Sequence, residues 1–377
     1  MAEYKTLVKK IPISPDKKTK QKDYLKKGQL PIVDQGQSLV GGYTDDANMT
    51  VECELPVIVF GDHTRAVKYI TFPFGAGADG IKVLQPKENI LPPFLYYGTQ
   101  YIVAKMPNRG YARHYQYVEK EDLPVPSLPE QERIVARIEE LFSQLDAGVE
   151  TLKKTKAQLA VYRQAVLKEA FESVIPESDT CNVEDVCKDI KVGIVIKPAQ
   201  YYTSADVGVR AFRSANVREF AVNDSDWVYL TKAGHEANLR SEIHTGDVLV
   251  VRSGYPGTAC VVPPTYNGCN AIDILIAVPY AEKILPEYLC AYTNSPLGKR
   301  IIQKKKRGVA QAHFNVSGYS KTPIIVPCLE TQKRVVAEID SRLSVCDSIE
   351  QTVDTALQQA EAMRQSILKD AFEGKLT

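Results

Sequence analysis

A segment of 47 residues occurs twice in this chain, at 127–173 and again at 328–374. The two copies align without a gap and are identical at seventeen of the 47 positions. Both end on nearly the same heptapeptide, which reads VLKEAFE at 166–172 and ILKDAFE at 367–373. Gly148 is the only glycine in the interior of either copy, so both are predicted to be long helices. A repeat kept in register implies that one polypeptide needs two equivalent surfaces.

Apolar residues recur along both copies at steps of three and four, which is typical of a coiled-coil seam. The seam comprises Ile134, Ile138, Leu141, Leu145, Val149, Leu152, Leu159, Tyr162 and Val166 in the first copy, and Val335, Ile339, Leu343, Cys346, Val353, Ala360, Met363 and Ile367 in the second. Ser127-x-x-Glu130 resembles a capping box, and Gly374 suits the end of the second helix. A helix of this length, roughly 65 Å at about 1.5 Å per residue, would leave its seam in water. The two helices are therefore expected to pack on each other, most simply antiparallel.

The repeat also extends into the segments between the helices. Ile90-Leu91-Pro92 matches Ile284-Leu285-Pro286, and the Arg-Gly-x-Ala sequence at 109–112 matches 307–310. The predicted domains are 1–126 with a basic N-terminal arm at 1–27, the helix 127–173, a second domain at 174–327, and the helix 328–377. Strand-like runs at 56–60, 69–72, 247–251 and 274–278 predict a twisted sheet in each globular part. The expected fold is mixed α/β (α+β): two globular domains separated by two long antiparallel coiled-coil helices, with an internal pseudo-twofold repeat. The lysine-rich start before Leu30 shows no clear counterpart of the entry segment 178–196.

Composition bounds the function. The apolar fraction of 44% and charged fraction of 25% are typical of a soluble globular protein. The N-terminal residues MAEYKTLVKK do not resemble a signal peptide, and no long apolar run follows, which indicates a cytoplasmic protein without a membrane anchor. The eight cysteines form no C-x-x-C pair, which favours buried thiols over a metal site. Basic residues are concentrated, with nine lysines in 1–27 and seven basic residues but no acid in 288–329.

Catalytic patterns are only approximated. Leu91-Pro-Pro-Phe94 resembles an amino-methyltransferase signature, but leucine cannot accept the hydrogen bond that the first residue of that signature takes from the target amine. The glycine cluster Phe74-Gly-Ala-Gly77 has the wrong spacing for a cofactor loop, and there is no phosphate-binding G-x-x-x-x-G-K-(S/T) sequence. The leading interpretation is therefore a chain that binds rather than catalyses. A self-contained DNA methyltransferase or nuclease, and a coiled-coil scaffold without nucleic acid, remain the alternatives.

Duplex DNA suits two domains held by a spacer, because half-sites on one face recur at about 34 Å. Candidate contacts lie in predicted loops, where Arg, Asn, Gln and His can address base edges and lysines the phosphates. They are His63, Arg65, Arg109, Tyr111, Arg113 and His114 in the first domain, and Arg210, Arg213, Asn216, Arg218, Arg252, Tyr255, Lys304, Lys305, Lys306, Arg307, Gln311 and His313 in the second. Each could instead be a surface ion-pair partner.

The alternation of diverged domains with repeated helices is similar to the specificity subunit of type I restriction-modification enzymes. The P-x-L-x-x-Q-x-x-(I/V)-V-A helix openings at 126–136 and 327–337 carry this resemblance, as do the closing L-K-(D/E)-A-F-E and the C-terminal GKL. The segment PVIVFGDHTR (56–65) also resembles one class of target recognition domain in that family.

The resemblance implies a subunit without catalytic residues or metal, in which each domain recognises one half of a split double-stranded DNA target. The helices would set the gap between the half-sites and dock two modification (methyltransferase) subunits, which hold S-adenosylmethionine. Restriction subunits, which cleave and translocate DNA with ATP, would then join. The helix residues assigned to packing and docking are Ile134, Ile138, Leu141, Leu145, Arg163, Phe171, Val335, Ile339, Arg364 and Phe372. The duplication predicts equivalent environments for Arg163 and Arg364, and for Phe171 and Phe372.

Overall fold

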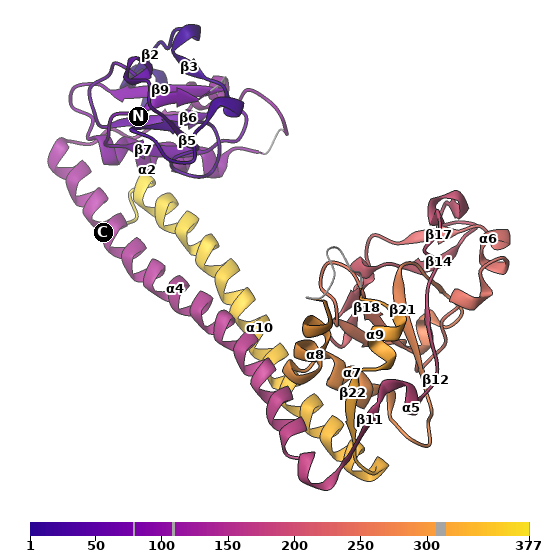
Figure 1. Ribbon diagram of the computed structural model, residues 1–377. Coiled ribbons are helices and arrows are strands. Elements are labelled where there is room, and N and C mark those ends of the chain that lie inside the picture. Colours follow the sequence, from indigo (N-terminus) through magenta and orange to yellow (C-terminus); the bar gives the residue numbers. More distant parts are fainter. Residues whose placement is uncertain (78–79, 108–109, 307–313, 377) are drawn as a thin grey trace. The chain divides into compact units, whose positions relative to one another are not determined.

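The computed structural model describes residues 1–377 except 78–79, 108–109, 307–313 and 377. The chain divides into two compact units (Figure 1). The first unit comprises Met1–Lys153 and Asp354–Thr377, and the second comprises Lys154–Val353. The two long helices, α4 (Leu128–Glu172) and α10 (Leu329–Phe372), each contribute one part to either unit. Within each unit these helix segments run antiparallel, which together with the two sheet-bearing units confirms the predicted fold class.

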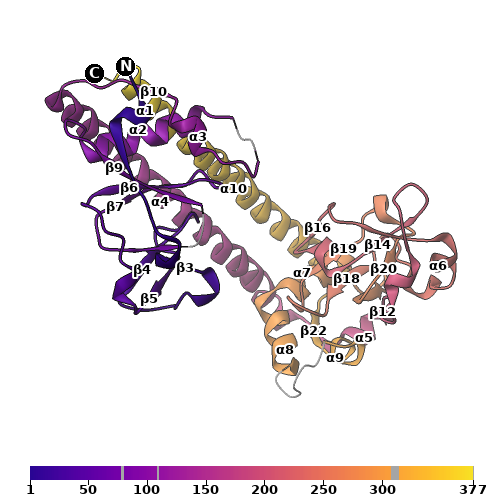
Figure 2. The ribbon, with the colours of Figure 1, turned by 90° about the horizontal axis from the view of Figure 1, so that it is seen from above.

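The first unit is built on a four-stranded antiparallel sheet in the order β2-β9-β6-β7. These strands are Val8–Ile11, Ile81–Pro86, Val57–Gly61 and Val67–Ile70. A smaller sheet has the order β3-β8-β4-β5, with strands Lys18–Thr19, Gly75–Gly77, Leu30–Val33 and Gly42–Thr44. Figure 2 shows this smaller sheet on the side of β6 and β9 away from α1 (Tyr4–Leu7) and α2 (Pro92–Lys105). All five residues of β6 are buried because both faces of the larger sheet are covered.

The second unit repeats this plan with different residues. Its larger antiparallel sheet has the order β12-β21-β18-β19, with strands Cys187–Val192, Ile274–Pro279, Val248–Val251 and Ala259–Val261. Its smaller sheet has the order β13-β17-β14-β20, with strands Tyr202–Thr203, Val228–Leu230, Val209–Phe212 and Asn270–Ala271. The other helices are α5 (Val183–Val186), α6 (Lys232–Glu236), α7 (Pro286–Asn294), α8 (Pro296–Lys306) and α9 (Val316–Ser320).

The smaller sheets differ in the placement of their fourth strand. In both units an antiparallel pair, β4 with β5 or β14 with β17, is extended by a parallel strand, β8 or β20. In the first unit β3 joins beyond the parallel strand, whereas in the second unit β13 joins at the opposite edge, beside β17. The second unit also carries a short hairpin, β15 (Val217–Arg218) and β16 (Ala221–Val222), between β14 and β17. The units therefore share a frame but expose different surfaces.

The structure corrects the expectation that the start of the chain has no counterpart later. Strand β1 (Ala2–Glu3), α1 and β2 correspond to β11 (Asp179–Asn182), α5 and β12. Strand β1 pairs with β10 (Asp122–Leu123), as β11 pairs with β22 (Pro323–Val326). The first eleven residues thus form two strands and a helix of the first unit rather than a basic arm. The correspondence escaped sequence analysis because it preserves burial and pairing, not residue identity.

A pair of buried positions has exchanged large and small side chains between the units. In the first unit Tyr4 begins α1, and its hydroxyl lies 2.7 Å from Oγ1 of Thr99, while Val118 occupies α3 (Tyr115–Val118). In the second unit Val183 begins α5, and the hydroxyl that meets Thr293, at 2.9 Å, belongs to Tyr319 of α9. All four aromatic and valine side chains are almost completely buried. At these two positions each unit holds one tyrosine and one valine, so the total side-chain volume is the same in both cores.

The predicted equivalence of the helix residues is confirmed. Arg364 forms an ion pair with Asp146, and Arg163 pairs with Asp347 at 2.6 Å, its counterpart 201 positions along. Phe372 lies 5.0 Å from Phe94 and 5.3 Å from Tyr101 of α2, measured between ring centroids. Phe171 lies 5.2 Å from Tyr288 and 5.1 Å from Tyr292 of α7. In both units the phenylalanine of the closing A-F-E sequence fills an aromatic pocket on the helix after the larger sheet.

The N-terminal turns of α4 and α10 are also fixed by the same hydrogen bonds in both units. Gln131 and Gln332 are completely buried, and each amide oxygen accepts a hydrogen bond from the backbone N–H of Leu91 or Leu285, at 2.8 and 2.9 Å. Each amide nitrogen donates to two backbone carbonyls, one of them that of the proline two residues before the helix begins. At the other end of α10, Gly374 adopts φ of +72°, where glycine is favoured, and closes the helix as predicted.

Part of the predicted seam was placed wrongly. Tyr162 and Met363 are 45% and 55% exposed, whereas Val135 and Phe142, which lie outside the predicted stripe, are each 6% exposed. The stripe shifts because these helices pack against α2 and α7 as well as against each other, which widens their apolar face beyond a two-helix seam. Among the residues that the structure describes, no helix has the length and apolar character needed to cross a membrane.

Candidate nucleic-acid interface

In the first unit, several predicted contacts meet where the β6–β7 turn lies beside the loop between α2 and α3. The imidazole of His63 stacks on the ring of Tyr111, with centroids 4.3 Å apart and planes 4° from parallel. His63 Nδ1 lies 3.2 Å from the carbonyl oxygen of Ala112. Arg65 has φ of +61°, and its Nη1 donates to the carbonyl of Met106 at 3.3 Å. Tyr111 is 85% exposed, so the stacked pair presents an aromatic face to solvent.

His114 anchors this loop and is not itself available to a ligand. It is completely buried, its backbone N–H donates to the carbonyl of Asp62 at 2.8 Å, and Nδ1 lies 3.0 Å from the same oxygen. The Asp62 carboxylate in turn accepts a hydrogen bond from the N–H of Tyr115 at 2.9 Å. The assignment of His114 as a DNA contact is therefore corrected. Arg113, two residues before α3, remains exposed.

The second unit has the same junction. The N–H of Phe314, at the end of the loop before α9, donates to the carbonyl of Arg252 in the β18–β19 turn at 3.3 Å. Arg252 reaches across to Asp273, with Nη1 and Oδ1 3.1 Å apart. Tyr255, at the tip of the turn, is 85% exposed. Tyr255 and Arg218 both line a hollow of about 460 Å³, together with Ser214, Val217, Glu219, Val251, Ser253 and Thr258.

Arg210, Arg213 and Asn216 lie on and just after β14. Asn216 is completely buried, and its amide bonds the backbone at three places: the N–H of Arg213 and the carbonyls of Asn223 and Ser225. The prediction of a base contact by Asn216 is thus corrected, since its side chain holds the loop in shape. Arg213 is half-buried and donates from Nη2 to the carbonyl of Asp226. Arg210 lies against two aromatic rings.

Several predicted contacts fall outside the described part of the chain. Arg109, Arg307, Gln311 and His313 are not described by the structure. Lys304, Lys305 and Lys306 belong to the last turn of α8, and the structure does not describe their side chains. The contacts of these residues with DNA remain predictions.

Equivalent positions at the two junctions differ in charge. Asp62 after β6 corresponds to Arg252 after β18, and Asp34 after β4 corresponds to Arg213 after β14. In the first unit Nζ of Lys68 donates to the Asp34 carbonyl at 2.8 Å and lies 3.6 Å from its carboxylate. Burial lowers the pKa of Lys68, although Asp34 opposes this. Sequence analysis missed Lys68, because an isolated lysine in a strand gives no sign that it will be buried.

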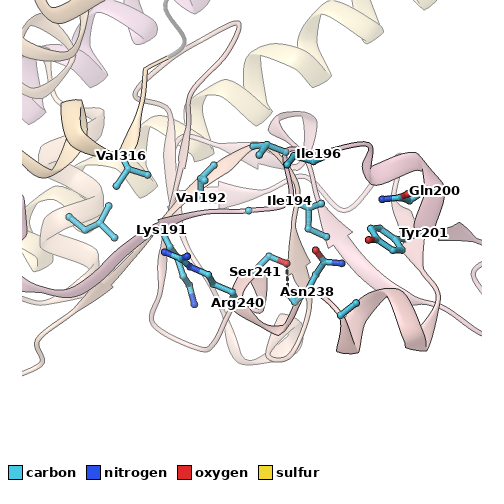
Figure 3. A pocket seen from close by; sticks show the side chains of 14 residues that line it. Lys191, Val192, Ile194, Ile196, Gln200, Tyr201, Asn238, Arg240, Ser241 and Val316 are labelled. Carbon is cyan, nitrogen blue, oxygen red and sulfur yellow. Dashed lines mark hydrogen bonds between the residues drawn. The ribbon is translucent and has the colours of Figure 1, made fainter.

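A second hollow in the second unit was also missed. It has a volume of about 550 Å³ and lies beside β12 and the chain that follows it. Figure 3 shows Lys191 and Arg240 at one end and Gln200 and Tyr201 at the other, with Ile194 and Ile196 between them. Ile196 is 75% exposed. These residues come from segments far apart in sequence, so no local pattern indicated them.

The predicted helix residues divide into packed and accessible ones. Ile138, Phe171, Val335, Ile339 and Phe372 are buried in the cores of their own units, which leaves them no role in direct contact with a partner. Ile134, Leu141 and Leu145 are half-buried at the helix surface. Among the described residues no three His, Cys, Asp or Glu side chains come together as a metal site would require.

Comparison with known proteins gives a consistent result. A family model described as the type I restriction modification DNA specificity domain matches residues 10–160. The type I restriction enzyme EcoBI specificity subunit of Escherichia coli is 25% identical over 374 residues, which cover 90% of this chain and 74% of that protein. The EcoR124I/EcoR124II specificity subunit of Escherichia coli is 24% identical over 351 residues, covering 88% and 83%.

Two solved structures share the fold. One, described as addressing complex assembly and conformational transition of the type I R-M system, has a TM-score of 0.70 at 16% identity and covers 99% of this chain and 97% of its own. The HsdS subunit from Thermoanaerobacter tengcongensis has a TM-score of 0.52 at 17% identity and covers 99% and 96%. At these identities the structures support the architecture of the chain alone.

Proposed function

Since this chain belongs to the family of type I restriction-modification specificity subunits, we propose that each of its units recognises one half of a split DNA target. The recognition surface includes the sheet turn, β6–β7 or β18–β19, together with the loop that precedes α3 or α9. The observation that carries this proposal is the same backbone hydrogen bond between turn and loop in both units, His114 to Asp62 and Phe314 to Arg252. The junction is the same in both units, but its exposed side chains differ, so the two units are suited to recognise different DNA sequences.

The chemistry of the two surfaces supports two different half-sites. The first unit offers the stacked His63 and Tyr111 with Arg65, and the Asp34 carboxylate nearby is paired with Lys68. The second unit offers arginines at the corresponding positions and the exposed Tyr255. Arginine forks bind guanine or phosphate, whereas aromatic rings stack on bases or pack on thymine methyl groups. The target is accordingly asymmetric.

The long helices serve as the spacer and the partner-docking surface. We take 127–173 and 328–377 as the spacer segments, with recognition domains at 1–126 and 174–327. Equivalent ion pairs and aromatic pockets in the two units support the docking of one modification subunit at each. Those subunits hold S-adenosylmethionine, and restriction subunits that use ATP join the complex in the cytoplasm. The half-buried Ile134, Leu141 and Leu145 are the candidates for contact with a partner.

The proposal is tested by mapping methylated bases in the host genome with and without this gene. Loss of one asymmetric two-part motif with a fixed gap is the expected result. Tyr111→Ala and Tyr255→Ala then form a matched pair, because both residues are 85% exposed and neither supports a core. Each variant should relax a base in one half of the motif and leave the other half unchanged. Retention of every motif after deletion, in a host whose modification subunits are active, would contradict the proposal.

A further inference from the structure

Arg210, on β14 of the second unit, is held against aromatic rings. Its guanidinium carbon lies 5.6 Å from the centroid of the Trp227 ring and 6.0 Å from that of Tyr266. Both rings pack on the completely buried Phe212, with centroids 4.8 and 5.3 Å from it and planes nearly perpendicular. A guanidinium above such rings is attracted by their negative faces. The position of the arginine is therefore set before any ligand arrives.

The donors of this arginine are only partly used. Asp224 lies 4.0 Å away, at the limit of an ion pair, because its carboxylate is already bonded to Nε1 of Trp227 at 2.7 Å and to the hydroxyl of Tyr266. Tyr229, directly across the β14–β17 ladder, also bonds Arg210. A guanidinium carries five N–H donors, and the side chain is 41% exposed. Donors thus remain for a ligand at the solvent edge.

Among its described residues, the first unit has no equivalent of this arrangement. The residue that pairs with Tyr43 across the corresponding ladder is Pro31, where the second unit pairs Arg210 with Tyr229. Proline has no side-chain donor. The arginine is consequently a property of one unit, as expected of a residue that determines a sequence and not of one that supports the shared frame.

We infer that Arg210 is a specificity-determining residue that donates two hydrogen bonds to O6 and N7 of one guanine in the half-site recognised by the second unit. The inference rests on the proposed function. Two parallel N–H groups match the two acceptors that guanine presents in the major groove. Fixing the guanidinium on Trp227 and Tyr266 lowers the entropy lost on binding. A purely structural Arg210, which only covers the aromatic cluster, would show no dependence on any particular base.

The test uses the complex assembled with its modification subunits and a duplex carrying the motif found by methylation mapping. Each guanine of the motif is replaced in turn by 7-deazaguanine, which keeps base pairing but lacks the N7 acceptor. Dissociation constants are measured at one salt concentration for the wild type, Arg210→Ala and Arg210→Lys. Arg240→Ala is the matched control, since it removes one exposed arginine from the same unit.

The complete bidentate contact corresponds to roughly 5- to 150-fold in affinity. Because 7-deazaguanine keeps O6 and loses only N7, the wild type should lose part of that factor, at one guanine in one half-site. Arg210→Ala should be insensitive to replacement of that guanine, and Arg210→Lys should keep most of its affinity but lose the discrimination, because an ammonium lacks the planar fork. Arg240→Ala should retain the full dependence. If the wild type prefers its motif but Arg210→Ala keeps the same guanine dependence, or the half-site lacks guanine, the inference fails and the proposed function stands. If the wild type shows no preference for the motif, the proposed function itself fails.

Discussion

The exchanged tyrosine and valine predict that the two cores can be interconverted. In the first unit, Tyr4→Val removes a completely buried ring and its 2.7 Å contact with Thr99, and Val118→Tyr adds a ring where none fits. The first change should destabilise the chain by about 3–4 kcal/mol, from several buried carbons at about 0.8 kcal/mol each and one hydrogen bond of about 1 kcal/mol. The second should cost about 2–3 kcal/mol through overpacking. Together they recreate the arrangement of Val183 and Tyr319 in the second unit.

The double variant should therefore be within about 1.5 kcal/mol of the wild type, the range for volume-conserving exchanges, with a coupling energy of about 3.5–7 kcal/mol. Urea unfolding of the full chain, followed by circular dichroism, measures all four corners of the cycle. The only tryptophan, Trp227, lies in the second unit, so its fluorescence reports the unfolding of that unit. As a control, this fluorescence transition should shift in the reverse variants Val183→Tyr and Tyr319→Val. Simple additivity of the two single variants would refute the equivalence of the two cores.

Three further outcomes are expected. Gln131→Ala and Gln332→Ala should each lower the free energy of unfolding by about 2–4 kcal/mol, since each leaves three backbone groups, most of them partly buried, without their side-chain partner. A loss below about 1 kcal/mol in urea unfolding would contradict this. Phe372→Ala and Phe171→Ala should each cost about 3–5 kcal/mol by the same measurement, with similar values for the two because both fill aromatic pockets. Among the thiols, Cys328 should react first with a disulfide reagent in the native protein and give a fast phase of the reaction. It is exposed, and a hydrogen bond to Thr331 lowers its pKa, so its thiolate persists to lower pH than that of an ordinary cysteine. Cys328→Ser should abolish the fast phase, and a fast phase that survives the substitution would disprove the assignment.

The protection of the other thiols follows from burial. Burial raises the pKa of Cys187 and of Cys260 to about 12, so at neutral pH both remain thiols shielded from the reagent. This agrees with the interpretation of these cysteines as small apolar residues. It also explains why the cysteine pattern carried no functional information.

Sequence analysis succeeded where the chain repeats itself in register. The helix openings share Gln131 and Gln332, and the closing sequences share Phe171 and Phe372, so identity alone marked positions that the structure shows to be equivalent. It failed at positions that are equivalent in the two units but hold different residue types, because there only the packing is preserved. Tyr4 corresponds to Val183, and no alignment by identity would pair them, because the compensating change lies in α3 and α9 more than a hundred residues away.

Buried polar residues were the other source of error. His114 and Asn216 are residue types that bind bases, yet both side chains turn inward to bond the backbone. The direction of a loop side chain depends on which carbonyls lack a partner in the folded unit. That information is absent from a local motif.

The sequence by itself determined the order of the parts, because hydrophobic periodicity and internal identity are properties of neighbouring residues and of register along the chain. It therefore predicted two long helices, two sheet-bearing units and the equivalence of the helix ends. Only the tertiary structure decided which side chains share a surface: Arg210 above Trp227 and Tyr266, or His63 on Tyr111. Those pairs are joined by strand pairing and loop closure over long separations, and their energies depend on distances that exist only after the chain has folded.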